Sequence, residues 1–517
     1  MHVCLWPLLR EQAATRPDEQ FSDCVGESLT YAQAEALVAR VGVGLLGLGL
    51  ARGERVALFA ENSGDVLLAW LGANAAGLVD VPINIDARGD FLRFLLGDAA
   101  PRAIVASVER LNALADLTDD LPGIAVALDG DPADVRGFER VAAFSSLRDT
   151  DTTPDDLPTR ALSTGDLATI MYTSGTTGPS KGVMLPHGYY ATFGSLIAER
   201  YRLTSGDMLY GAQPLYHIDA RMTVICALCT GARVTLGRRF SPRRFWSEAR
   251  ACGATRFIYI GTMVWMLFKQ EETPEDGTQP APVGLGSSTP WEILNAFEQR
   301  FNTTLIEAYG MTEAVLLTCN TLDDRRHGSV GKPSSVIELR IVDEHDEPVP
   351  AGQEGEIVFR PRVPNVIMQG YWNQPAATQE TWRNLWFHTG DLAHMDEDGF
   401  VYYHGRGKDS IRRRGENISA WEVEQALTLH PEVLEAAAFG VPSPVGEEDV
   451  AVLCVTKPNS PLTHPQLHQY VSKDLPRFAV PRFIEFVDQL PKTPSERIAK
   501  AEVRERGLTD AAWDATP

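Results

Sequence analysis

The sequence predicts an α/β protein with a large N-terminal domain of mostly parallel sheet and a smaller C-terminal domain. Segments with helical and with strand-like spacing alternate through the first 150 residues, which implies right-handed crossovers between parallel strands. After Gly331, short alternating segments between turn residues take over and indicate antiparallel hairpins. A chain of 517 residues is also too long for one ordinary domain.

The N-terminal alternation can be followed segment by segment. Residues 28–50 carry apolar side chains at helical spacing and end in a glycine-rich stop. Residues 54–60 predict a short buried strand, residues 65–78 a helix and residues 79–84 another strand. Residues 148–166 are rich in Asp, Thr and Pro and predict a surface connection.

The C-terminal third changes character twice. Residues 336–343, 355–361 and 399–405 predict strands of a small antiparallel, barrel-like subdomain. Beyond a Gly-Arg-Gly-Lys-Asp segment, helical and strand-like stretches mix again. We therefore predict an N-terminal domain of residues 1–407 and an α+β C-terminal domain of residues 408–517, whose length is a common domain size.

The composition excludes several classes of protein. Lys and Arg total 47 against 69 Asp and Glu, so the formal net charge is −22 and the chain repels nucleic-acid backbones. There is no apolar stretch of about 18 residues and no secretory pattern at the N-terminus, so we expect neither a membrane partner nor secretion. Seven scattered cysteines favour reduced thiols and a cytoplasmic location. The oligomeric state stays open, with a homodimer as one alternative.

The sharpest motif is YTSGTTGPSKG, residues 172–182, directly after the strand-like residues 166–172. Glycines let backbone amides close on an anion, hydroxyl groups donate further hydrogen bonds, and the lysine adds a point charge, so the segment suits a polyphosphate. It is not a Walker loop, because Gly-Lys followed by Ser or Thr does not occur at the required spacing. A flexible surface turn is the alternative interpretation.

Three further segments carry polar residues in strand and turn contexts. EAYGMTE, residues 307–313, follows a predicted helix and a short strand. HTGD, residues 388–391, is expected at a turn before a hairpin, and residues 405–417 lie at the predicted domain boundary. Each segment alone is weak, because a carboxylate after a turn also caps a helix.

In this order and spacing the four segments resemble the adenylate-forming superfamily of acyl-CoA synthetases, luciferases and nonribosomal adenylation domains. The resemblance runs from Leu29 to about Lys500 and is greatest to the crotonobetaine/carnitine–CoA ligase branch. It implies that an acid attacks the α-phosphate of ATP to give an acyl-adenylate and pyrophosphate, after which a nucleophile, usually the coenzyme A thiol, displaces AMP. It also implies ATP and Mg2+ as cofactors, coenzyme A as co-substrate, a small-molecule acid as partner, and a mobile C-terminal cap.

The resemblance also assigns roles to individual residues. The phosphate-binding residues that it implies are Thr173, Ser174, Gly175, Thr176, Thr177, Gly178 and Lys181. Those implied beside adenine and the acid are Gly286, Ser287, Ser288, Tyr309, Gly310 and Met311. Thr312 would contact the α-phosphate and Glu313 would hold Mg2+, which prefers oxygen ligands. Asp391 would take the ribose hydroxyls with Arg406 adding a contact, and Lys408 falls at the hinge of the cap.

The C-terminal signature departs from the family. Relatives read Pro-Lys-Thr-x-x-Gly-Lys-Ile, with the last lysine bridging the substrate carboxylate and the α-phosphate, whereas residues 491–498 read PKTPSERI. Arg497 keeps the positive charge, but a planar guanidinium is not an ammonium point charge. Lys500 and Lys492 are alternative substitutes, and a slowed or altered adenylation step is the remaining alternative.

A second departure lies in PLYHIDAR, residues 214–221. Pro-Leu-aromatic-His matches the family, so His217 is implied to line the acid pocket, but Asp219 and Arg221 bring charge where relatives are small or apolar. One interpretation is a solvated helix end; the other is a pocket for a small polar or charged acid, with Arg221 pairing to a carboxylate. Both disfavour a long fatty acyl chain.

Cysteines and histidines outside these motifs are given structural roles. Cys226 and Cys229 have redox spacing but lie in an apolar helical run, so packed core thiols are expected. His187 and His327 lie in turn-like contexts, which predicts surface or capping residues rather than metal ligands.

Three hypotheses for function follow. The first is an AMP-forming ligase that joins a small or aromatic acid to coenzyme A. The second is a diazotase-like enzyme that activates nitrite with ATP and transfers it to an aryl amine without coenzyme A. The third is a non-catalytic adenylate-binding protein, against which the phosphate loop, Glu313 and Asp391 weigh.

Overall fold

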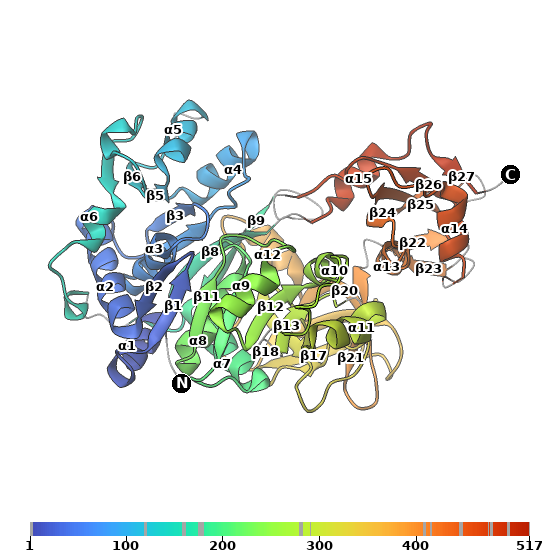
Figure 1. Ribbon diagram of the computed structural model, residues 1–517, viewed down its shortest axis with the longest axis horizontal. Helices are drawn as coiled ribbons and strands as arrows, with labels where there is room; N and C mark the ends of the chain where they lie inside the picture. The colour runs from blue at the N-terminus through green and yellow to red at the C-terminus, as the bar shows by residue number, and fades with distance from the viewer. Residues whose placement is uncertain are drawn as a thin grey trace. The chain divides into compact units, whose positions relative to one another are not determined.

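The computed structural model places the helices and strands shown in Figure 1. The residues that it describes are 4–117, 121–157, 162–173, 180–278, 283–289, 291–406, 410–413, 416–443, 448–473, 475, 479–493 and 497–515. None of the helices within these ranges is both long and apolar enough to cross a membrane. Contacts divide the chain into two compact units, the first taking in residues 1–173, 180–338 and 361–380, and the second residues 339–360 and 381–517.

The first sheet of the first unit has seven strands in the order β7-β6-β5-β3-β4-β8-β9. Its strands are β3 (Arg55–Phe59), β4 (Val79–Pro82), β5 (Ala103–Ala106), β6 (Ile124–Ala127), β7 (Arg140–Ala143), β8 (Leu167–Thr173) and β9 (Lys181–Pro186). All neighbours are parallel except β8 and β9. The crossover helices are α2 (Tyr31–Gly47), α3 (Gly64–Ala75), α4 (Gly89–Ala99), α5 (Val108–Leu117) and α6 (Phe144–Arg148). The predicted alternation of helix and parallel strand is confirmed.

The second sheet of the first unit has nine strands in the order β16-β15-β14-β13-β12-β10-β11-β1-β2. Its strands are β1 (Gln20–Cys24), β2 (Glu27–Thr30), β10 (Met208–Gly211), β11 (Arg233–Leu236), β12 (Arg256–Ile260), β13 (Val283–Ser287), β14 (Thr304–Met311), β15 (Ala314–Cys319) and β16 (Lys332–Pro333). The accompanying helices are α1 (Leu5–Thr15), α7 (His187–Tyr201), α8 (Ile218–Thr230), α9 (Phe245–Cys252), α10 (Gly261–Phe268), α11 (Trp291–Phe301) and α12 (Pro375–Thr381). β1 joins β11 in parallel, and β14 turns back into antiparallel β15.

The start of α2 shows how local sequence sets an element. Thr30 and Gln33 form a capping box, in which the Thr30 side chain accepts from the Gln33 amide and the Gln33 side chain accepts from the Thr30 amide. α2 packs closely on α3. A Cβ at Gly42 would stand only 2.9 Å from the carbonyl oxygen of Gly72, so glycine is needed at this contact. The glycines of this helix pair therefore permit a contact that larger residues would block.

The second unit contains the predicted antiparallel strands and an α+β region. The five-stranded sheet follows the order β17-β18-β20-β19, with β21 paired to β20. Its strands are β17 (Ile337–Val342), β18 (Gly355–Pro361), β19 (Trp382–Arg383), β20 (Trp386–Met395) and β21 (Val401–Arg406). The later elements are β22 (Ser410–Arg413), β23 (Glu416–Ser419), α13 (Ala420–Thr428), β24 (Val433–Pro442), β25 (Glu448–Thr456), α14 (His464–Val471), β26 (Phe483–Phe486), α15 (Lys500–Arg506) and β27 (Trp513–Asp514). The domain boundary after residue 407 stays a prediction, because residues 407–409 lie outside the described ranges.

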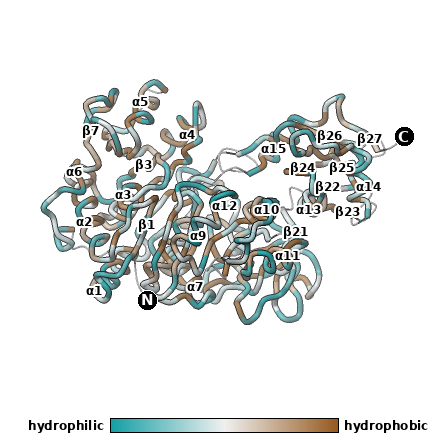
Figure 2. The backbone as a smooth tube through the Cα atoms, in the orientation of Figure 1, coloured by the Kyte–Doolittle hydropathy of each residue, from teal (hydrophilic) through white to brown (hydrophobic). Residues whose placement is uncertain are grey.

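Each unit has its own buried hydrophobic clusters. In the first unit, apolar residues of β3 to β6 pack with one face of α4 and α5. In the second unit, the alternating residues of β24 and β25 face two separate clusters, one of which includes α13 and α14. Figure 2 colours the backbone by hydropathy, and hydrophobic segments occur in both strands and helices. The alternation of β24 and β25 residues between two clusters is expected of a sheet that is covered on both faces.

Candidate active site

The predicted phosphate loop connects two antiparallel strands. β8 ends at Thr173 and β9 begins at Lys181, and these residues are paired across the hairpin, with the Thr173 hydroxyl donating to the Lys181 carbonyl at 3.4 Å. The remaining predicted loop residues, Ser174, Gly175, Thr176, Thr177 and Gly178, lie outside the described residues. The hairpin therefore holds the two ends of the loop side by side. One end carries the Thr173 hydroxyl and the other carries the Lys181 side chain.

Lys181 and Glu313, the predicted metal ligand, both contact the side chain of Tyr371. The Lys181 ammonium stands 4.8 Å from the centre of the Tyr371 ring, a cation–π distance. The Tyr371 hydroxyl donates to Oε1 of Glu313 at 2.7 Å. Tyr371 is held by strand-like pairing of its neighbours with β9, including a 2.7 Å bond from the Trp372 amide to the Gly182 carbonyl. We call Lys181, Tyr371 and Glu313 the phosphate-side cluster.

Thr312 and Glu313 occupy the turn between β14 and β15. The Tyr189 hydroxyl donates to the Thr312 carbonyl at 3.0 Å, and the Met368 amide donates to the Glu313 carbonyl at 2.9 Å. Gly310 must lack a side chain, because a Cβ there would stand 2.0 Å from the Val315 carbonyl oxygen. The turn backbone is therefore fixed from three sides.

Glu313 fits a magnesium ion that is shared with phosphate. No cluster of three or more His, Cys, Asp or Glu within the described part of the chain is arranged to hold a metal. Mg2+ commonly takes one or two protein carboxylates and the rest of its oxygens from phosphate and water. Glu313, which contacts the same tyrosine as Lys181, offers one such carboxylate.

The residues predicted beside adenine lie on β13, on β14 and in the loop after β13, near the buried carboxyl group of Glu307. Gly286 lies in β13 opposite Glu307 of β14, and a Cβ at Gly286 would stand 2.1 Å from the Tyr259 carbonyl oxygen. Ser288 has a positive φ of 59°, an uncommon conformation for a non-glycine residue. Ser287 lies between them in β13, and Tyr309, on β14, is buried.

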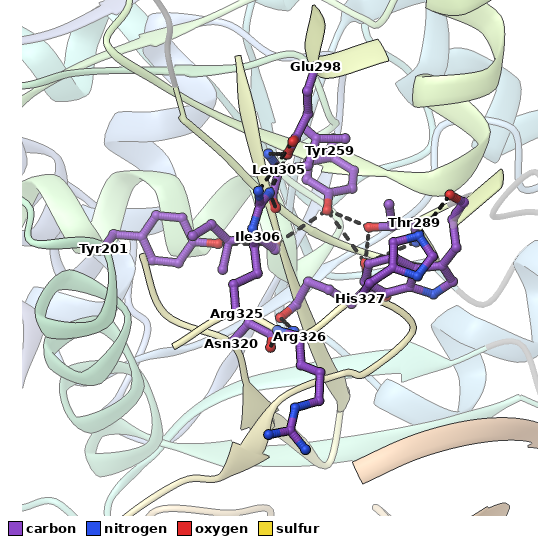
Figure 3. A network of polar contacts seen from close by, with 12 residues as sticks. Tyr201, Tyr259, Thr289, Glu298, Leu305, Ile306, Asn320, Arg325, Arg326 and His327 are labelled. Carbon is purple, nitrogen blue, oxygen red and sulfur yellow. Dashed lines mark hydrogen bonds and ion pairs between the residues drawn. The ribbon is translucent and has the colours of Figure 1, made fainter. Parts of the chain in front are cut away.

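Glu307 anchors this loop, and sequence reasoning did not single it out. Its carboxylate accepts from both the amide and the hydroxyl of Thr289, in the network that Figure 3 shows around Tyr259 and Thr289. Burial raises the pKa of Glu307 to about 7, against the lowering effect of these hydrogen bonds. The sequence places Glu307 directly after the predicted short strand, which gives no signal that its carboxyl group is buried.

The first five residues of EAYGMTE and all of HTGD lie in strands, whereas HTGD was predicted at a turn. β14 continues through Met311, so Tyr309 pairs with Thr318 of β15. HTGD lies within the ten-residue β20, where Gly390 has a φ of 74° and the pairing with β21 shifts after Leu392. The turn prediction for HTGD was therefore wrong: the glycine bends a continuing strand instead of ending it.

Asp391 is buried in β20 and lies opposite Arg406 of β21. The Tyr403 hydroxyl donates to its Oδ1 at 3.4 Å. The side chain of Arg406 and the whole of the predicted hinge, Lys408, lie outside the described residues.

The acid-pocket motif forms a turn followed by α8. His217 precedes the helix, its amide donates to the Pro214 carbonyl at 2.9 Å, and its ring packs against Tyr216. Asp219 lies in the first helical turn, where a carboxylate is favourable. Burial raises the pKa of the Tyr189 hydroxyl well above its usual value, and the carboxylates of Glu313 and Asp219 add to this rise. Asp219 and Glu313 therefore act on the same tyrosine.

Arg221 fits neither interpretation of its charge. It is 1% exposed, so it does not lie on a solvated helix end. Its guanidinium forms a 2.6 Å ion pair with Asp80, which is 0% exposed, so it is not directed to a substrate carboxylate. Sequence spacing gave no signal for this partner, which lies 141 positions earlier in the chain.

The three cations of the C-terminal signature are held differently. Lys500 is ion-paired to Glu424 and donates to the Ala438 carbonyl at 3.4 Å, while Lys492 pairs with Glu435 at 2.7 Å. Arg497 is exposed, and its backbone is fixed by bonds to Thr493 in both directions. Among the described contacts, only the two lysines have ion pairs.

The predicted structural roles of the cysteines and histidines have mixed outcomes. Cys226 is buried and Cys229 mostly buried in α8, as expected. His187 is 0% exposed, so the prediction of a surface or capping residue was wrong: it opens α7 against the core. Burial lowers the pKa of His187 to about 4.

Comparisons with known proteins show the family of the chain. The family described as AMP-binding enzyme matches residues 9–372, and that described as AMP-binding enzyme C-terminal domain matches residues 422–497. The chain is 31% identical to a sulfoacetate–CoA ligase of Cupriavidus necator over 96% of both chains. It is 30% identical to a crotonobetaine/carnitine–CoA ligase of Salmonella choleraesuis, covering 94% of this chain and 95% of the other.

Solved structures give the same match. ATP-bound MatB from Rhodopseudomonas palustris superposes with a TM-score of 0.84 at 27% identity, over 98% of this chain and 99% of the other. The anthranilate CoA ligase AuaEII, in complex with anthranoyl-AMP, has a TM-score of 0.87 at 24% identity over 97% of both chains and so supports the fold.

Proposed function

The chain belongs to the AMP-binding enzyme family, and from this premise we propose that it is an AMP-forming acid:CoA ligase. It activates a carboxylic acid with ATP as an acyl-adenylate, releasing pyrophosphate, and then transfers the acyl group to the thiol of coenzyme A with release of AMP. The observation that carries the proposal is the phosphate-side cluster, in which Lys181 and Glu313 are joined through Tyr371.

The acid is small or aromatic. Sulfoacetate, crotonobetaine, carnitine and anthranilate are named for the relatives above, and all are compact acids with a polar group or an aromatic ring. His217 and Asp219, at the start of α8, supply polar groups for such a substrate. Because Arg221 is ion-paired to Asp80, we do not assign it to the acid. We assign recognition of the acid to His217 and Asp219 instead.

The cluster residues divide the work of adenylation. Lys181, with Thr173 and the rest of the loop, binds the β- and γ-phosphates, and Thr312 contacts the α-phosphate. Glu313 holds Mg2+, which neutralises phosphate charge when bound. Tyr371 keeps the carboxylate oriented through its hydrogen bond to Oε1. Gly286 to Ser288 and Tyr309 enclose adenine, while Asp391 and Arg406 bind the ribose. Phosphoryl chemistry needs this positioning and charge neutralisation more than covalent help.

Arg497 takes the role of the signature lysine. The support for this choice is the ion pairing of the alternatives, since Lys500 and Lys492 each have a carboxylate partner within their own unit. Removing either lysine from its partner would leave a carboxylate without its cation. Arg497 is exposed on a loop whose backbone is held by Thr493, so its charge is available to substrate.

The two other hypotheses find no support. The sulfoacetate, crotonobetaine/carnitine and anthranilate relatives are named as ligases of organic acids to coenzyme A, and nothing in those names favours nitrite activation. The non-catalytic hypothesis conflicts with the assembled phosphate-side cluster.

The test is an assay of pyrophosphate release from ATP with short, sulfonated, betaine-like and aryl acids and with nitrite, each with and without coenzyme A. The expected result is release that depends on one class of carboxylic acid, and thioester formation when coenzyme A is added. Release that requires nitrite and an aryl amine, with no thioester from any acid, would contradict the proposal.

A further inference from the structure

Arg221, which the mechanism above does not use, contacts five parts of the first unit besides its own helix. It extends from α8 and contacts residues of β4, β8, α7 and the turn of residues 214–217. Its guanidinium also lies 4.5 Å from the ring centre of Trp70 on α3. A side chain that is 1% exposed therefore has partners on every side.

On one side the guanidinium is tied to the strand that leads into the phosphate loop. Oδ2 of Asp80 is 2.6 Å from Nη2 of Arg221, while Oδ1 accepts from the Thr169 hydroxyl at 2.6 Å. Thr169 pairs with Asp80 between β4 and β8, and Nη1 of Arg221 donates to its hydroxyl at 3.3 Å. β8 ends at Thr173, where the phosphate loop begins.

On the other side the guanidinium is tied to the acid-pocket turn. Nε of Arg221 donates to the Leu215 carbonyl at 2.7 Å, and the Leu215 amide donates to Oδ1 of Asn62 at 2.7 Å. The amide and the carbonyl of Leu215 are therefore both hydrogen-bonded to buried side chains. Leu215 lies in the same turn as His217, two residues before it. The guanidinium fork thus links the turn directly to Asp80 and Thr169.

The local volume excludes a substrate from this position. The cavity beside Arg221, Trp70 and Tyr216 holds about 10 Å3, enough for one water molecule but not for a carboxylic acid. The Asp80 carboxylate also counters burial, which alone would lower the pKa of Arg221, and holds that pKa above its ordinary value. Arg221 therefore stays charged, and its action on the reaction is indirect.

A buried ion pair is a weak source of stability, since apolar residues of similar volume often serve as well. Its distinctive property is geometric, because a planar guanidinium holds several acceptors in fixed directions. We propose that Arg221 is a positioning residue that holds the acid-pocket turn, and with it His217, in register with the strand that carries the phosphate loop. This inference rests on the proposed function and assigns the alignment of acid and nucleotide to one side chain.

The test compares three variants in acid-dependent ATP–pyrophosphate exchange and in hydrogen exchange of residues 213–218 in the ligand-free protein. D80N/R221M removes both charges, while the amide oxygen of the new asparagine keeps an acceptor for Thr169, so the fold avoids an unpaired buried charge. Arg221→Lys keeps the charge but loses the fork. Arg256→Met is the matched control, because Arg256 forms a mostly buried pair with Asp207 on another part of the same unit.

D80N/R221M is expected to lower kcat at least tenfold, to leave the KM for ATP within twofold, and to speed hydrogen exchange in residues 213–218. Arg221→Lys is expected to lower kcat less while melting at the wild-type temperature; if D80N/R221M does not fold, this variant decides the question. Arg256→Met is expected to change neither kinetic constant. Wild-type kcat and hydrogen exchange in D80N/R221M and Arg221→Lys would overturn the proposal. If the wild-type protein shows no exchange with any acid, the proposed function fails, and hydrogen exchange alone decides the role of Arg221.

Discussion

The phosphate-side cluster and the C-terminal signature hold their cations in different ways. In the cluster, the Lys181 ammonium faces the ring of Tyr371, and the hydroxyl of the same tyrosine donates to Glu313. In the signature, Lys500 and Lys492 are each paired with a carboxylate of their own unit, and Arg497 is exposed. The difference teaches that a lysine near the expected position is not thereby a catalytic lysine, because its charge can already serve the fold.

The largest effect is expected in the cluster. Lys181→Ala and Glu313→Ala should each lower acid-dependent pyrophosphate release by roughly 100- to 1000-fold, the cost of losing one preorganised electrostatic contact. Lys332→Ala is the control, since its exposed pair with Asp324 contributes little. Unchanged release in either cluster variant would show that the nucleotide site has been misplaced.

The next effect separates the three signature cations. Arg497→Ala should slow adenylation about 100-fold with an unchanged melting temperature, because the exposed charge that we propose acts in place of the signature lysine is lost. Lys500→Ala should lower the melting temperature and leave adenylation within about threefold, since it strands the Glu424 carboxylate. The measurement is single-turnover formation of the acyl-adenylate, with Lys492→Ala as a second structural control. The reverse pattern would assign the role to Lys500.

A smaller effect is expected at Tyr371. Tyr371→Phe keeps the ring beside Lys181 but removes the hydroxyl that orients Glu313, and a hydrogen bond to a charged group is worth about tenfold in rate. The loss should appear in the dependence of pyrophosphate release on Mg2+ concentration. An equal loss at saturating Mg2+ would instead place the hydroxyl on substrate.

The smallest effect concerns stability rather than catalysis. The pKa of His187 is lowered to about 4 in the folded protein, against about 6.5 when unfolded, so the unfolded chain binds the extra proton between these values. Stability should therefore be complete above pH 6.5 and decline as the pH falls towards 4. His187→Phe should flatten this part of the melting-temperature profile, whereas the exposed His345→Gln should not. Parallel profiles for wild type and His187→Phe would show that other groups govern the acid limb.

Sequence reasoning recovered the fold and the ends of the phosphate loop, because hydrophobic periodicity and glycine-rich motifs report local structure. It did not recover partners supplied by distant strands. Tyr371 joins the cluster through pairing with β9, and Asp80 neutralises Arg221 across the sheet; neither contact leaves a pattern in the spacing of nearby residues. The buried carboxyl group of Glu307 and the buried ring of His187 were missed for the same reason, since burial depends on the packing of whole layers.

The stoichiometry of one turnover decides whether the protein is an AMP-forming acid:CoA ligase. The protein is incubated with ATP, Mg2+ and the accepted acid, pyrophosphate is measured, and coenzyme A is then added. We expect one pyrophosphate per active site before coenzyme A, followed by one AMP and one thioester after it. Release of inorganic phosphate and ADP, or of AMP without thioester at any coenzyme A concentration, would contradict this expectation.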